Sequence, residues 1–222
     1  PVSFVFNGGV HHRDSLGNDS VIYSGGVQWI NSGSGIIHSE RPPKDLVGSD
    51  APQEFIQLWV NTPAANKMDA PSYQGFTKEE LPLITSSDGK IQFSVVSGSF
   101  QGKSGPVNSN TDVLSAMIFA EENGSHQITL DSSHHAMLYI LKGNVEIDGK
   151  QIQGKNLVVF ESGETGFELS TLEPTHALLL SGAPIKEPVA TYGPFVMNNQ
   201  QEIIQALNDA HDGKMGELVE NF

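Results

Sequence analysis

Short apolar runs, separated by glycine, proline and polar residues, fill the chain as far as about residue 198. They are rich in the β-branched and aromatic residues that favour strands, and turn residues recur between them at close spacing. This pattern predicts an all-β barrel or sandwich rather than strands alternating with helices. The prediction rests on the runs VSFVF, VIYSGGVQWI, EFIQLWVN, IQFSVVSGSF, HAMLYIL and NLVVF.

Part of the strand pattern occurs twice. The segment SFVFNGGV (3–10) resembles LYILKGNV (138–145), and an offset of 135 residues aligns Gly8 with Gly143. The pattern of EFIQLWVN (54–61) likewise resembles that of HALLLSGAP (176–184), since each strand leads into a loop. An internal repeat of this length indicates two similar β-barrels in tandem.

The expected boundary between the barrels is the polar stretch QGKSGPVNSNTD, residues 101–112, which carries few apolar residues. We therefore expect an N-terminal barrel over residues 1–105 and a C-terminal barrel over residues 110–190. The remaining residues, 191–222, form a tail.

The tail is expected to contain one amphipathic helix. Ile203, Ile204, Leu207 and Ala210 recur with helical spacing and share one face. Either asparagine of the pair before this stretch can cap its start, and a glycine three residues after Ala210 can end it. The apolar stripe is expected to pack against one of the barrels.

Composition and charge remove several classes of function. The 222 residues include no cysteine, which excludes disulfides, thiolate metal sites and thiol nucleophiles. The net charge is −14 and the only arginines are Arg13 and Arg41, so direct binding to nucleic acid or to an anionic membrane is not expected. Without a signal peptide or an apolar run long enough to span a bilayer, the expected location is the cytoplasm.

The stretch GIIHSERP (35–42) carries the main chemical signal. In a strand, Ile36, His38 and Glu40 project from the same face. If that face points into a barrel, the carboxylate is costly to bury unless it is paired or binds a metal. The alternative is a polar pair on an exposed strand edge. Without thiolates, a metal held by imidazole and carboxylate ligands could be iron, manganese, nickel, copper or zinc.

Three segments resemble the pirin family: HHRDSLG…GGVQWINSGSGIIHSE, LWVNTPAANKMDAPSYQ (58–74) and GAPIKEPVATYGPFVMNNQQEIIQA (182–206). The resemblance spans nearly the whole chain. It implies a bicupin, that is, two cupin-type β-barrels, with a single iron in the N-terminal one. It also implies His38 and Glu40 as two of the ligands.

The other two ligands of the family are a His-x-His pair, which the resemblance places upstream of Pro1. The chain starts without Met and within a strand pattern, so we expect residues to precede Pro1. Loss of the site is the alternative. The resemblance gives His11 and His12 a structural role in a polar network that closes a hairpin.

The second barrel is expected to hold no metal. Its counterpart of GIIHSE is TGFELS (165–170), which has no histidine, and the adjacent His134 and His135 cannot both project from one strand face. In the first barrel, Phe4 and Phe6 are expected to line the interior. Of the neighbours Gln28 and Trp29, the tryptophan is expected in the core, and the glutamine could lie beside the ligands.

Some pirins cleave the flavonol quercetin in a 2,3-dioxygenase reaction, so the resemblance implies a metal-dependent oxygenase with a small aromatic substrate. In that hypothesis Glu40 is both a ligand and the catalytic general base. The alternative is a redox-sensitive regulatory protein that binds a transcription factor or a metabolic enzyme without turnover. A metal-free structural bicupin is the third hypothesis. We expect a monomer, because the barrels and the helix can satisfy one another within one chain.

Overall fold

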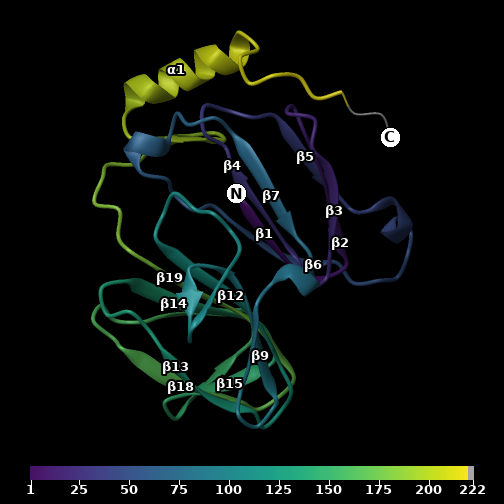
Figure 1. The fold of residues 1–222 in the computed structure, drawn as a ribbon, viewed down its shortest axis with the longest axis vertical. Coiled ribbons are helices and arrows are strands. Elements are labelled where there is room, and N and C mark those ends of the chain that lie inside the picture. Colours follow the sequence, from purple (N-terminus) through teal and green to yellow (C-terminus); the bar gives the residue numbers. More distant parts are fainter. Residues whose placement is uncertain (220–222) are drawn as a thin grey trace. The chain divides into compact units, whose positions relative to one another are not determined.

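The computed structural model describes residues 1–219 and divides them into two units. Unit 1 contains Pro1–Lys78 and the segment from Ile185 onward, and unit 2 contains Glu79–Pro184. Both units consist mainly of β-strands, and the one α-helix of the described residues lies near the C-terminus (Figure 1). The predicted fold class, all-β with a short C-terminal helix, is confirmed. No helix in the described part of the chain has the length and apolar character needed to cross a membrane.

Unit 1 places two antiparallel sheets in one barrel. One sheet has the order β6-β1-β4-β7 and the other the order β3-β2-β5. The interior side chains Val5, Val10 and Ile22 are almost fully buried and pack together. The strands are β1 (Val2–Asn7), β2 (Gly9–Asp14), β3 (Asp19–Tyr23), β4 (Val27–Asn31), β5 (His38–Arg41), β6 (Glu54–Leu58) and β7 (Ser72–Phe76).

Unit 2 has a six-stranded sheet of order β17-β14-β19-β12-β9-β8 and a four-stranded sheet of order β13-β18-β15-β16. Alternate residues of both sheets form one apolar core, as period-2 alternation requires. A short β10-β11 pair completes the unit. The strands are β8 (Leu83–Thr85), β9 (Ile91–Ser97), β10 (Ser99–Phe100), β11 (Lys103–Ser104), β12 (Val113–Ala120), β13 (Ser125–Thr129), β14 (His135–Lys142), β15 (Asn144–Ile147), β16 (Lys150–Gln153), β17 (Asn156–Val159), β18 (Gly166–Thr171) and β19 (Thr175–Gly182).

The division between the units differs from the boundary expected in residues 101–112. β9 forms a ladder with β12, so the strand that precedes the polar stretch belongs to unit 2. The polar stretch is therefore a loop inside unit 2, and the chain leaves unit 1 after Lys78. Composition marks a loop, but only hydrogen bonds between strands decide to which unit it belongs.

The repeat seen in the sequence reappears in the strand ladders. β1 and β2 join at Gly8, and β14 and β15 join at Gly143; both glycines have positive φ, 78° and 91°, which other residues rarely adopt. β1 lies between β6 and β4, just as β14 lies between β19 and β17. The structure thus confirms two similar barrels.

The C-terminal segment returns to unit 1. It forms β20 (Ala190–Tyr192), β21 (Phe195–Met197) and α1 (Gln200–His211). Asn199 caps α1 by accepting a hydrogen bond from the backbone N–H of Glu202 at 3.0 Å, as predicted for this pair of asparagines. The helix contacts the β20-β21 hairpin, and within it Ile203 alone is fully buried, whereas Ile204 is 57% exposed. The predicted apolar stripe is thus only partly covered.

Beyond α1 the chain reaches the segment that leads into β5. The Ser15 hydroxyl donates to the carbonyl oxygen of Met215 (2.7 Å) and accepts from the backbone N–H of Ile37 (3.2 Å). Gly35 has a φ of 121°, and a Cβ there would meet the Met215 side chain at 2.5 Å. Ile37, the residue before His38, is therefore linked by hydrogen bonds through Ser15 to the C-terminal segment.

In unit 2, Asp88 is expected to make stability depend on acid pH. Its carboxylate accepts from the Ser86 hydroxyl and from the backbone N–H groups of Lys90 (3.0 Å) and Ser125 (2.8 Å), which lowers its pKa from 3.8 to about 2. A carboxyl group whose pKa is lowered in the folded state stabilises the fold above pH 3.8 and loses that contribution as the pH falls towards about 2. Asp88→Asn should therefore unfold at lower urea than the wild type at neutral pH, and the difference should shrink through this pH range. Unfolding is followed by far-UV circular dichroism at each pH. A difference in urea midpoint between the two proteins that stays constant with pH would contradict this prediction.

Candidate metal centre

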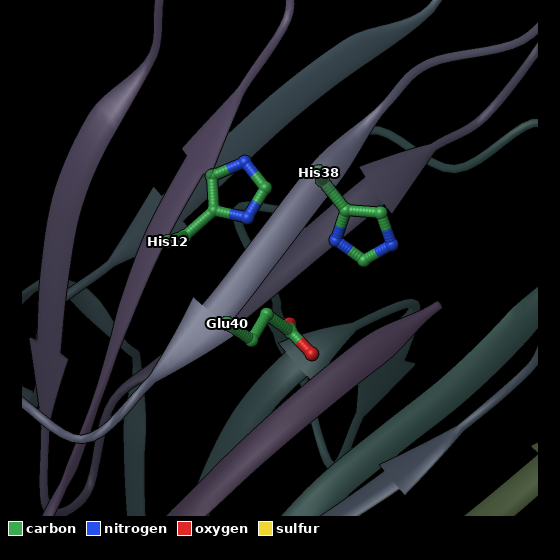
Figure 2. A group of neighbouring side chains, drawn as sticks. All are labelled: His12, His38 and Glu40. Carbon is green, nitrogen blue, oxygen red and sulfur yellow. The ribbon is translucent and has the colours of Figure 1, made fainter. Parts of the chain in front are cut away.

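Two neighbouring strands of unit 1 bring two imidazoles and a carboxylate together. His12 comes from β2, and His38 and Glu40 come from β5, which pairs with β2 so that His12 lies opposite Glu40. One ligand atom of each side chain lies within 4.8 Å of the others. Figure 2 shows the three side chains as neighbours on these strands. Within residues 1–219 they are the one such group of potential metal-binding side chains.

His12 is oriented by a buried carboxylate. Its Nε2 lies 2.9 Å from Oδ2 of Asp14, and both side chains are fully buried. Burial raises the pKa of Asp14, but hydrogen bonds from His12, Asn18 and the backbone of Leu16 outweigh it and leave that pKa below its ordinary value. The anionic Asp14 assigns the proton of His12 to Nε2, so Nδ1 carries a lone pair. This Nδ1 is buried and has no hydrogen-bond partner in the protein.

His38 differs from His12 because it keeps access to solvent. Partial burial lowers the pKa of His38, although the negative charge of Glu40 acts in the opposite direction. At neutral pH the ring is therefore mainly uncharged, which is the form that binds metals. The ring centroids of His12 and His38 are 5.7 Å apart.

Polar side chains of the facing sheet surround Glu40. Its Oε1 accepts from the hydroxyl of Ser3 (3.2 Å) and from Nε2 of Gln28, and its Oε2 accepts from Nε2 of Gln57. Tyr73 stacks on His12 with ring centroids 4.3 Å apart. The face of β1 that carries Ser3 is thus the face towards the site.

This orientation corrects one expectation. Phe4 alternates with Ser3 and therefore projects from the opposite face of β1, away from the site, whereas a register shift between Val5 and Asn7 interrupts the alternation at Phe6. Both are fully buried all the same. On β4, Gln28 faces Glu40 and Trp29 takes the other face, in agreement with the assignment of the glutamine to the ligands' surroundings and of Trp29 to the core.

The other histidines do not join this group. His11 projects from the opposite face of β2 and pairs with Asp19 at 2.6 Å. His134 lies in unit 2, where its Nδ1 is 3.3 Å from the hydroxyl of Ser181. At the positions of unit 2 that correspond to His12, His38 and Glu40, the ladders place Ile147, Phe167 and Leu169.

The family resemblance implied only a structural role for His12, in closing the hairpin. That network exists, because Asp14 binds His12 and the turn residues Leu16 and Asn18. The same ring also belongs to the group with His38 and Glu40, and Nδ1 is its nitrogen without a partner. The sequence showed that His12 and Asp14, two residues apart, share one face of a strand. It did not show that β2 pairs with β5.

The side chains fit a metal ion. A buried lone pair without a partner, an uncharged imidazole and a carboxylate form the mixed nitrogen and oxygen donor set that first-row transition metals prefer. His12, His38 and Glu40 are the residues that could hold it. Without a metal, a buried nitrogen that has no hydrogen-bond partner would only destabilise the folded state.

Comparison with known proteins places this geometry in a family. The family model described as Pirin matches residues 1–60, and the model of the pirin C-terminal cupin domain matches residues 116–216. Pirin-1 of Arabidopsis thaliana is 34% identical over 97% of this chain and 74% of its own length. The pirin-like protein of Caulobacter vibrioides is 33% identical over 96% of this chain and 76% of its own length.

A solved structure shares the fold. The crystal structure of a quercetin 2,3-dioxygenase from Acinetobacter baumannii superposes with a TM-score of 0.92 at 29% identity, covering 98% of this chain and 76% of that one. Together with the two matching family models, it identifies the two barrels as cupin domains. The chain belongs to the pirin family of the cupin superfamily.

Proposed function

We propose that this pirin-family protein binds one transition-metal ion in its N-terminal barrel and acts as a dioxygenase on a flavonol such as quercetin. The observation that carries the metal site is the buried, unpartnered Nδ1 of His12 beside His38 and Glu40. The choice of reaction is supported by the likeness to a protein described as a quercetin 2,3-dioxygenase.

Iron is the metal we expect, held by His12, His38 and Glu40 and by the His-x-His pair that the family resemblance predicts. Bound there, it would supply Lewis acidity towards a substrate hydroxyl and a site for redox chemistry with dioxygen. Asp14 fixes the ring of His12 and keeps its Nδ1 available to the site.

Glu40 is the proposed general base. It is the carboxylate of the group, and an acceptor of this kind can take the proton of a flavonol hydroxyl if that hydroxyl replaces one of the side-chain donors now bound to it. Tyr73, stacked on His12, adds an aromatic wall beside the site. Aromatic and apolar walls favour a flat, largely apolar substrate and exclude water.

The test is metal content and turnover of the protein expressed from its natural start codon. Wild type, His38→Ala and Glu40→Ala are compared by elemental analysis and by loss of quercetin absorbance with oxygen uptake. The control is His135→Ala, an exposed histidine of unit 2. We expect about one metal ion per chain in the wild type and the control, and loss of metal and turnover in the other two variants, because each removes a ligand.

The outcomes separate the hypotheses. A wild type without metal would contradict the proposed site and leave the structural bicupin. Metal that is bound and lost in the variants, but without turnover of quercetin, would favour the regulatory hypothesis, in which a protein partner replaces the substrate.

A further inference from the structure

Three polar side chains form a row across the sheet that faces Glu40. Ser3 in β1 lies directly opposite Gln28 in β4 and Gln57 in β6. Such cross-strand neighbours have adjacent side chains on one face of a sheet. Ser3 and Gln28 are almost fully buried, whereas Gln57 is exposed. The two buried members of this row must find partners for their polar atoms.

The three side chains of the row form hydrogen bonds with Glu40 and with one another. The hydroxyl of Ser3 donates to Glu40 (3.2 Å) and accepts from Nε2 of Gln57 (3.0 Å). Both glutamines also donate to Glu40, one to each carboxylate oxygen. Three donors thus occupy three of the roughly four acceptor directions of a carboxylate, which leaves about one direction for a further contact.

Tyr73 sets which end of Gln28 faces Glu40. Its hydroxyl lies 3.5 Å from Oε1 of Gln28, so the amide NH₂ of that residue is directed to the carboxylate. The Tyr73 ring also stacks on His12. The orientation of Gln28 is therefore linked to the position of a potential metal ligand.

Unit 2 shows the same row without its polarity. The residue that corresponds to Ser3 is Leu138, and it lies opposite Val158 and Leu179. The residue that corresponds to Glu40 is Leu169, which is fully buried. Within one chain, the carboxylate and all three of its donors are thus replaced together by aliphatic residues.

We propose that Ser3, Gln28 and Gln57 are positioning residues that fix the Glu40 carboxylate, and that this fixation makes Glu40 an effective metal ligand. The part of this proposal that concerns metal binding rests on the proposed function. The row supplies hydrogen bonds to the carboxylate that an aliphatic row cannot, and it holds both oxygens while one acceptor direction stays open.

The first arm of the test uses metal-free protein and a double-mutant cycle of Gln28→Leu and Glu40→Leu. Gln28→Leu alone should lower the melting temperature by roughly 2–8 °C, because it leaves Glu40 short of a donor. In the Glu40→Leu background the same change should cost nothing or raise the melting temperature, as the aliphatic row of unit 2 implies. Additive effects of the two substitutions would overturn the fixation of Glu40.

The second arm titrates the same proteins, and Gln57→Leu, with Co²⁺ and follows its visible absorption bands, which report affinity and coordination. Gln28→Leu and Gln57→Leu should each weaken binding about 10–100-fold and alter the bands, whereas the surface control Gln151→Leu in unit 2 should do neither. Equal affinity in wild type and both variants overturns the role of the row in metal binding. A wild type that binds no Co²⁺ overturns the proposed function, and coupling in the first arm then still supports the fixation of Glu40.

Discussion

His12→Ala is expected to remove metal from the protein as completely as His38→Ala does. The substitution deletes the buried Nδ1, which has no partner in the protein. It also removes the ring whose ligand atom lies within 4.8 Å of ligand atoms of His38 and Glu40. Loss of one donor from a small set of ligands weakens binding more than loss of a residue that only orients a ligand, for which about 10–100-fold is typical. Metal per chain after dialysis, measured by elemental analysis, checks the prediction.

The matched control is His11→Ala. His11 is the preceding residue on β2, but it projects from the other face and pairs with Asp19 near the surface. The His11→Ala substitution should therefore leave the metal content unchanged. A His12→Ala protein that keeps wild-type metal content would show that His12 serves the hairpin alone, as the family resemblance implies.

Asp14→Ala should have the largest effect on stability, a loss of roughly 3–5 kcal/mol, because several buried donors lose their charged acceptor at once and each unsatisfied donor costs about 1–3 kcal/mol. Asp14 accepts from His12 Nε2 and Asn18 Nδ2 and from the backbone N–H groups of Leu16 and Asn18. All of these donors lose their acceptor in the variant, and His12 also loses the group that sets its tautomer. Urea unfolding followed by tryptophan fluorescence reports on unit 1 specifically, because Trp29 and Trp59 both belong to it.

Asp19→Ala is the control for this experiment. Asp19 also binds a histidine, His11, and additionally Arg13, but its side chain is 57% exposed. Exposed ion pairs contribute only about 0–1 kcal/mol. If both aspartate variants lose stability equally, burial is not what makes Asp14 important.

Much of the fold was predictable because it is local. Alternation and turn residues identify strands, and a repeated strand–glycine–strand pattern identifies two barrels with Gly8 and Gly143 at equivalent turns. The cap of α1 follows from the asparagines that precede Glu202. None of these features depends on residues far away in the sequence.

The structural features that differ from the expectations depend on pairing between strands that are far apart in the sequence. All of Val2–Phe6 is buried, so the pattern of β1 does not reveal which face is the interior, and Phe4 was assigned to the wrong one. The division between the units depends on the ladder between β9 and β12 rather than on loop composition. His12 became a candidate ligand only when β2 was paired with β5.

The order of the two units along the chain has a consequence for synthesis on the ribosome. Unit 1 is interrupted: its first part ends at Lys78 and its second begins at Ile185, whereas unit 2 is one continuous segment. At the usual rates of translation, about 5–20 s pass between the two parts of unit 1. During that interval the strands that carry His12, His38 and Glu40 have emerged, but Glu187, which accepts from the backbone N–H of Ala64 at 2.7 Å, and Met215, which binds Ser15, have not. The continuous unit 2 can therefore finish folding first, although it is encoded later than the site.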